Sequence, residues 1–268
     1  MKKFISLFFT FIFFASLSAF SKEIKIAQIT DIAYSASAED FEIEDNLLKF
    51  IQEVNSSNYD LVVFSGDMTK KSKKEDIEKF TQIAKQLKKP YYIALGENDV
   101  HKASGIKKED YMRYANYHNK YLKTDSPNYR VNLSNKITML VLDGASPVVK
   151  NTHGYFSEKT LLWFDKQLKK NKNKKVVIFQ HFPIVPPEEN YKYETNNADK
   201  YLDVIRKHNN ILFIAAGHFD KENTFIDEYG VEHIATPAFK KSPYPYREII
   251  INDKTFEITT NIKELQNE

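Results

Sequence analysis

Five short apolar runs in this 268-residue sequence each end on a side chain that can bind a metal ion. These side chains are Asp31, Asp67, Glu97, His181 and His218, with Asp220 two residues beyond the last of them. A single Asp after a strand is usually a helix cap or a turn residue, but capping does not explain five such positions in series. If the runs are strands of an open α/β sheet, their carboxyl ends meet in one crevice. Because carboxylate oxygens and imidazole nitrogens bind divalent cations, the sequence predicts a metal centre there.

The runs have the composition of buried strands, because they are short and rich in β-branched residues. They cover residues 24–30, 61–65, 91–95, 176–180 and 211–216, and a sixth run of the same kind covers residues 137–142. Helical patterns lie between them. An apolar stripe predicts a helix around residues 47–54, a capping box starting at Ser72 predicts a second helix, and Ser157 is the expected N-cap of a third. Residues 225–260 return to strand–turn–strand patterning. This alternation predicts an α/β layered domain with helices outside a mixed sheet.

Composition and charge narrow the possible functions. The sequence has no cysteine, which excludes disulfides and thiolate metal sites. Lys2 and Lys3 precede an apolar run over residues 4–20, which predicts a secretory signal peptide over residues 1–21, with an uncleaved anchor as the alternative. Residues 22–268 are then one domain without a membrane span, exported to the periplasm or the extracellular space. Losing the two lysines lowers the net charge from +3 to +1, too little for a nucleic-acid-binding surface.

Five sequence blocks resemble those of the calcineurin-like metallophosphoesterases. The family pattern is D-x-H, G-D, G-N-H-D, H-x-P and G-H-x-H, in this order and each after a strand. The corresponding blocks here are Asp31-Ile32-Ala33, Gly66-Asp67, Gly96-Glu97-Asn98-Asp99, His181-Phe182-Pro183 and Gly217-His218-Phe219-Asp220. Their order and spacing make the resemblance specific. It implies a four-layer α/β/β/α sandwich with mixed sheets, two divalent cations bridged by Asp67, and hydrolysis of a phosphate ester by metal-activated water.

The resemblance divides the expected metal ligands between two positions. One position takes Asp67, Glu97, His181 and His218, which is a complete set of nitrogen and oxygen ligands. The other retains only the carboxylates Asp31, Asp67 and Asp220, because Ala33 stands where the family has a histidine. Carboxylates favour Mg²⁺, Ca²⁺ or Mn²⁺, and imidazole favours Zn²⁺ or iron. One or two divalent ions of these metals are therefore expected.

The resemblance also indicates catalytic groups in and after the third block. Asn98 stands where the family has a histidine that contacts the ester, and Asp99 matches the family pattern. His101 could replace the missing histidine, although a solvated loop position is the favoured interpretation of this residue. Two further departures are Glu97 in place of asparagine and Asp220 in place of the last histidine.

The favoured function is hydrolysis of a small phosphomonoester or phosphodiester by an exported metal-dependent enzyme. One alternative is a catalytically impaired relative that keeps the fold and binds a cation or a phosphorylated ligand. Another is an envelope interaction protein in which the metal is only structural. The expected partner is a small phosphate ester, and the oligomeric state stays open.

Overall fold

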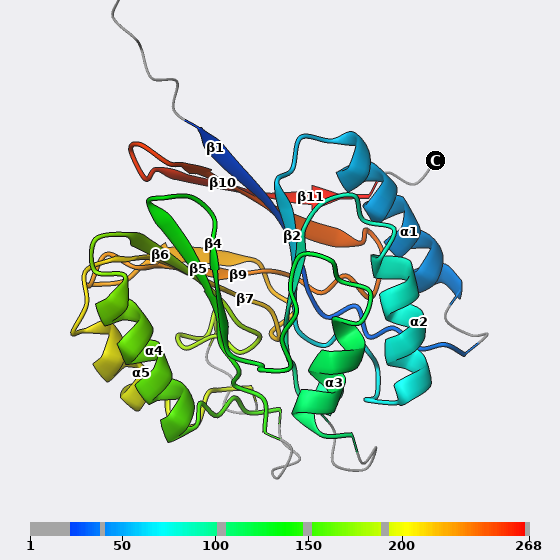
Figure 1. The fold of residues 1–268 in the computed structure, drawn as a ribbon, viewed down its shortest axis with the longest axis horizontal. Coiled ribbons are helices and arrows are strands. Elements are labelled where there is room, and N and C mark those ends of the chain that lie inside the picture. The colour runs from blue at the N-terminus through cyan, green and yellow to red at the C-terminus, as the bar shows by residue number, and fades with distance from the viewer. Residues whose placement is uncertain (1–21, 38–40, 101–105, 147–151, 189–192, 266–268) are drawn as a thin grey trace, which may run out of the picture.

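Two mixed sheets form the centre of the computed structural model, which describes residues 22–37, 41–100, 106–146, 152–188 and 193–265 (Figure 1). The first sheet has the order β11-β10-β1-β2-β3. Its strands are β1 (Glu23–Ile29), β2 (Leu61–Ser65), β3 (Tyr91–Ala94), β10 (Pro245–Asn252) and β11 (Ile258–Glu264). The three strands β1, β2 and β3 are parallel, whereas β10 and β11 run antiparallel to their neighbours.

The second sheet has the order β4-β5-β6-β7-β9-β8. Its strands are β4 (Tyr129–Asn132), β5 (Ile137–Val141), β6 (Lys175–Phe179), β7 (Ile211–Ala216), β8 (Asn223–Ile226) and β9 (Glu232–Ala235). Strands β5, β6, β7 and β9 are parallel to one another, and β4 and β8 are antiparallel edges. Every residue of β2 and β5 is buried, as expected for strands that are covered on both faces.

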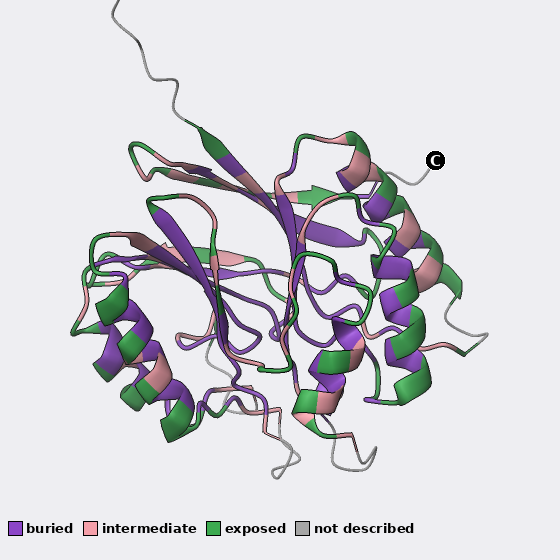
Figure 2. Cartoon of the chain, viewed as in Figure 1, coloured by how far each residue is buried: buried purple, intermediate pink, exposed green. Residues whose placement is uncertain are grey.

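Helices cover the outer faces of the two sheets, which gives the predicted four layers (Figure 1). The helices α1 (Phe41–Ser56), α2 (Lys74–Ala84) and α3 (Lys108–Ala115) lie on the side of the first sheet. The helices α4 (Glu158–Lys170) and α5 (Ala198–Ile205) lie on the side of the second. Their buried faces point inward and their exposed faces outward (Figure 2). The ring of Phe80 on α2 packs edge-on against Phe64 of β2, with centroids 5.2 Å apart.

Buried polar side chains join the two sheets. Gln28 on β1 donates from Nε2 to Oγ of Ser65 at 2.9 Å and to the carbonyl of Ala216 on β7 at 3.3 Å. Its Oε1 accepts from the Thr236 hydroxyl at 2.9 Å. The guanidinium of Arg247 on β10 in turn donates to Thr236 at 3.0 Å. Because buried polar groups cost free energy unless they are paired, this network favours one relative placement of the sheets.

The structure confirms the six predicted strands to within one residue at either end, and it confirms the strand–turn–strand pattern of the C-terminal part. Ser157 caps α4 as predicted, accepting from the Thr160 amide at 3.1 Å. The predicted capping box at Ser72 is wrong. The N-cap of α2 is Lys73, which makes no side-chain cap bond, and Ser72 lies one residue before it. No helix in the described part of the chain combines the length and apolar character of a membrane span. The predicted signal peptide lies outside the described residues.

Candidate metal centre

The predicted ligands lie in loops at the carboxyl ends of their strands, and four of them have a left-handed backbone. The φ angles are 53° for Asp31, 52° for Asp67, 72° for His218 and 53° for Asp220. Residues other than glycine adopt this region at an energetic cost, and such residues cluster at functional sites. Gly66 before Asp67 has a φ of 102°, and a Cβ at this position would collide with the imidazole of His181. The backbone conformation of these loops therefore determines where the candidate ligands lie.

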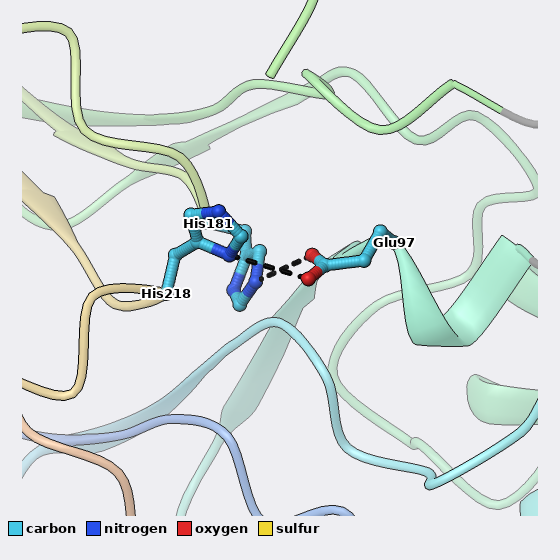
Figure 3. Close-up of side chains that lie close together, drawn as sticks. All are labelled: Glu97, His181 and His218. Carbon is cyan, nitrogen blue, oxygen red and sulfur yellow. Dashed lines mark ion pairs between the residues drawn. The ribbon is translucent and has the colours of Figure 1, made fainter. Parts of the chain in front are cut away.

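Three of the predicted ligands converge at the centre of the site (Figure 3). Nε2 of His181 lies 3.0 Å from Oε2 of Glu97, and Nδ1 of His218 lies 3.3 Å from Oε1 of the same carboxylate. Both imidazoles are buried, whereas the Glu97 side chain is 19% exposed. Glu97 follows β3 of the first sheet, and the histidines follow β6 and β7 of the second. The cluster therefore spans the boundary between the two sheets.

Backbone carbonyls fix which nitrogen of each imidazole carries a proton. Nδ1 of His181 lies 3.0 Å from the carbonyl oxygen of Ser65, and Nε2 of His218 lies 2.6 Å from that of Thr152. Because a carbonyl oxygen only accepts, these nitrogens are the donors. In the neutral rings the lone pairs of His181 Nε2 and His218 Nδ1 therefore face the oxygens of Glu97. Such an array of acceptors is repulsive unless protons or a cation lie between them.

A second group brings Asp31 and Asp67 close to His181. Oδ2 of Asp67 lies 3.8 Å from Nε2 of His181. Oδ2 of Asp31 accepts from the Thr30 hydroxyl at 2.8 Å and from the His218 amide at 2.9 Å. The backbone of one ligand thus holds the side chain of another. Both carboxylates are buried, and His181 belongs to both groups.

Asn98 and Asp99 make hydrogen bonds that hold the candidate ligands Asp67 and Glu97 in place. The Asn98 amide donates to Oδ1 of Asp67 at 2.8 Å, and its side-chain amide donates to Oδ2 of the same carboxylate. Asp99 is fully buried and accepts from the Thr69 amide at 3.1 Å, the Gly96 amide at 3.0 Å and the hydroxyl of Tyr111 at 2.6 Å. These bonds fix the loop that carries Glu97.

The structure does not bring Asp220 into either group of candidate ligands. Oδ1 of Asp220 accepts from the Ala238 amide at 3.0 Å, and Oδ2 lies 3.1 Å from the ammonium of Lys241. Its role as a ligand stays a prediction. Ala33 has a φ of 51° and offers no ligand atom where the family has a histidine. His101 lies outside the described residues.

The charges in the cluster shift one another's pKa values. Burial, reinforced by the charge of Glu97, raises the pKa of Asp67 well above its usual range. Burial opposes ionisation of Glu97 as well, but the imidazoles of His181 and His218, when protonated, outweigh burial and lower the pKa of Glu97. For His181, burial disfavours the charged ring, yet the surrounding carboxylates raise its pKa well above the usual range. The site therefore favours positive charge at its centre.

The side chains present fit a divalent cation. Nε2 of His181 and Oε2 of Glu97 are buried atoms for which the described part of the chain provides no hydrogen-bond partner. Buried polar atoms are rarely left in this state without an ion or a water. Two imidazole nitrogens with carboxylate oxygens are a ligand set suited to manganese, iron or zinc.

The sequence alone did not indicate the groups that orient these ligands. The carbonyls of Ser65 and Thr152 fix the two imidazoles, and Thr30 and Tyr111 hold Asp31 and Asp99. Metal-binding histidines generally donate their second ring N–H to such a carbonyl or carboxylate. Thr30 directly precedes a predicted ligand, which was a usable signal. No sequence signal indicated the contacts with the carbonyls, because these contacts depend on how the two sheets pack against each other.

Comparisons with known proteins identify related sequences. The calcineurin-like phosphoesterase family model matches residues 24–221. A probable glycerophosphodiester phosphodiesterase, GpdQ, from Arcobacter nitrofigilis is 30% identical over 171 residues, which cover 62% of this chain and 58% of that protein. A manganese-dependent ADP-ribose/CDP-alcohol diphosphatase from Danio rerio is 31% identical over 93 residues, 34% of this chain and 29% of that protein. The chain thus matches less than two thirds of the length of either relative.

A solved structure shares the fold. A dimetal phosphatase from Danio rerio superposes with a TM-score of 0.65 at 16% identity, covering 88% of this chain and 98% of that one. The resemblance indicated by the five sequence blocks is confirmed, as is the expected use of divalent metal ions by this family. The chain belongs to the calcineurin-like phosphoesterase family.

Proposed function

We propose that this protein is a metal-dependent phosphodiesterase, with Glu97, His181, His218 and Asp67 as the ligands of its catalytic cation. The observation that carries the proposal is the convergence of the two imidazole lone pairs on the Glu97 carboxylate. The choice of a phosphodiester rests on the relative from Arcobacter nitrofigilis, a probable glycerophosphodiester phosphodiesterase.

The protein's own residues have separable roles in this proposal. A divalent cation at the site would lower the pKa of a water molecule and neutralise phosphate oxygens. Asn98 orients Asp67 through both carboxylate oxygens. Asp99 holds the loop of Glu97 in place through Gly96 and Thr69. Preorganisation of this kind keeps the ligands and the substrate in a reactive arrangement.

The test is an assay on purified protein with bis(p-nitrophenyl) phosphate and p-nitrophenyl phosphate. Hydrolysis of the diester with Mn²⁺, abolished by chelation and restored by added Mn²⁺, is expected. A His181→Ala variant should lose this activity, whereas His208→Ala should keep it, because His208 pairs with Asp165 on α4 away from the site. Hydrolysis of the monoester alone would refute the choice of substrate class.

A second candidate is a catalytically impaired relative that binds a cation and a phosphorylated ligand. Two observations favour it: the side chain of Ala33 offers no ligand atom, and the backbone and side-chain amides of Asn98 both donate to Asp67. Removing a positioned acid costs about 10²–10⁴-fold in rate. Mn²⁺ binding without hydrolysis of either ester would support this candidate over the first.

We further propose that the protein is exported to the periplasm or the extracellular space. The charged start and the apolar run over residues 4–20 support a signal peptide. Lys22, the expected first residue after cleavage, donates its backbone N–H to Oδ1 of Asp253 at 3.1 Å, a position that suits a new α-amino group. Mass spectrometry of the mature protein should find an N-terminus near Lys22. An intact N-terminus on protein from the cytoplasm would refute export.

A further inference from the structure

The nitrogen ligands of this site serve only one ion. Nδ1 of His181 is committed to the Ser65 carbonyl, so the ring offers a single lone pair at Nε2. Both candidate groups depend on His181: one with Glu97 and His218, the other with Asp31 and Asp67. A single lone pair binds one cation, so the two groups cannot both be filled through this histidine. The group with Glu97 is favoured, because it adds a second imidazole and its oxygen lies nearer, at 3.0 Å.

The donors for a second ion are missing or engaged elsewhere. Ala33 has no ligand atom, and Asp220 is bound by the Ala238 amide and the Lys241 ammonium. The lysine side chain is 68% exposed, and it is the cationic partner that Asp220 has outside the ligand cluster. What remains, apart from His181, is Asp31 with Asp67.

Asn98 holds the carboxylate of Asp67 in one orientation. Asn98 donates to both of its oxygens, one bond from the backbone and one from the side chain. Each carboxylate oxygen has two lone pairs, so one per oxygen remains. Oδ2 faces His181 at 3.8 Å, and Oδ1 lies against the Asn98 amide at 2.8 Å.

We propose that the resting protein holds one divalent cation, at Glu97, His181, His218 and Asp67, and that the Asp220–Lys241 ion pair takes the place of a second metal position. The inference rests on the metal dependence in the proposed function and departs from the dimetal arrangement of the structural neighbour from Danio rerio. It applies to the protein without substrate, because phosphate oxygens can themselves complete the coordination of a hard ion.

The test is titration calorimetry of the metal-free full chain with Mn²⁺ in a phosphate-free buffer. One equivalent is expected, together with the electron paramagnetic resonance signal of isolated Mn²⁺ rather than that of a coupled pair. His181→Ala should weaken binding by at least about 100-fold, the upper range found for groups one shell further out. Asp220→Asn keeps an acceptor for Ala238, and it should leave both stoichiometry and affinity unchanged.

A variant that adds ligands tests why a second cation does not bind. Ala33→His combined with Asp220→His should bind a second equivalent of Mn²⁺, because it restores two donors. Two equivalents in the unmodified chain, a loss of affinity in Asp220→Asn, or one equivalent in the double variant would each overturn the inference. Two ions with diester hydrolysis would refute the inference alone. One ion without hydrolysis would refute the proposed function alone.

Discussion

Nδ1 of His181 lies 3.0 Å from the carbonyl oxygen of Ser65, the last residue of β2. His181 follows β6 in the second sheet, so this bond crosses between the sheets at the metal centre itself. The same division holds for the other ligands: Asp31, Asp67 and Glu97 follow strands of the first sheet, and His218 follows a strand of the second. Cation binding is therefore coupled to the packing of one sheet on the other.

Gly66→Ala should disrupt the metal centre directly. A Cβ at this position would collide with the His181 ring, and the φ of 102° is unfavourable for alanine. The ring must then move away from the Ser65 carbonyl that orients it. We expect the Mn²⁺ affinity to fall at least about tenfold, as for lost orienting groups at other metal sites. Titration calorimetry measures this change.

Gly230→Ala is the matched control for backbone strain. Gly230 also has a positive φ, of 76°, but a Cβ there would meet no atom within 4 Å. This variant should lose about 1 kcal/mol of stability from the left-handed backbone and keep its Mn²⁺ affinity. Equal losses of affinity in both variants would show that strain, and not contact with His181, is responsible.

Gln28→Leu should destabilise the protein through the contact between the sheets. The substitution removes the donor to Ser65 Oγ and the acceptor of the Thr236 hydroxyl proton in a buried region, although Thr236 keeps its bond from Arg247. Unpaired buried polar groups cost about 1–3 kcal/mol. Urea denaturation of the metal-free protein measures the difference. Gln82→Leu, at an exposed position of α2, should change the free energy of unfolding by no more than about 0.5 kcal/mol.

The fold was predictable from the sequence because its strands are buried runs with clear ends. The run at residues 61–65, for example, is entirely apolar up to Ser65 and is followed by the glycine of the turn. The convergence of Glu97, His181 and His218 was predictable in part, because each follows a strand. That Glu97 comes from one sheet and the two histidines from the other was not.

Other features depended on contacts that no local pattern reveals. The partner of Asp220 is Lys241, which is separated from it by β8 and β9. The side-chain bond from Asn98 to Asp67 depends on the register of β2 with β3. The capping box at Ser72 failed although its spacing fits, because the helix begins one residue later than the motif requires. Long-range geometry decided the first two cases, and the local start of the helix decided the third.

The turn between β8 and β9 should make stability depend on acidity. The carboxylate of Asp227 accepts from the amides of Tyr229 and Val231 and from Nε2 of His233, each at 2.9 Å. Burial alone would raise its pKa, but these bonds outweigh burial and lower the pKa of Asp227. The folded state therefore binds its proton less readily than the unfolded chain. The stabilisation is complete above the unfolded pKa of about 4 and is lost as the pH falls through the lower folded value.

Asp227→Asn tests this dependence by thermal unfolding as a function of pH. The variant should melt below the unmodified protein at pH 6, and the difference should shrink as the pH falls below about 4. Asp45→Asn, at an exposed position of α1, serves as the control and should follow the unmodified protein throughout. A difference for Asp227→Asn that stays constant with pH would mean that the carboxylate charge is not responsible.

Replacing Ala33, Asp220 and Asn98 by the histidines of the family pattern distinguishes two hypotheses. In one the protein is an enzyme that has lost part of its activity, and in the other its carboxylate-rich site is fully active. Ala33→His with Asp220→His supplies donors for a second cation, and Asn98→His supplies an acid for the leaving group. These repairs act on different parts of the reaction, namely metal retention and leaving-group stabilisation. If the chain is an eroded enzyme, the triple variant should raise kcat for bis(p-nitrophenyl) phosphate by at least about tenfold.

Asp220→His alone provides the decisive comparison. Because Asp220 is bound to Ala238 and Lys241 rather than to the ligand cluster, this single change should leave kcat near that of the unmodified protein. The hypothesis that the carboxylate-rich site is already catalytically active predicts a different result. It requires measurable activity of the unmodified protein with Mg²⁺ or Mn²⁺, a clear loss in Asp220→His, and no gain in the triple variant. Steady-state kinetics of the three proteins with one ester across several metals decides between these accounts, since one predicts an unchanged kcat for Asp220→His and the other a loss.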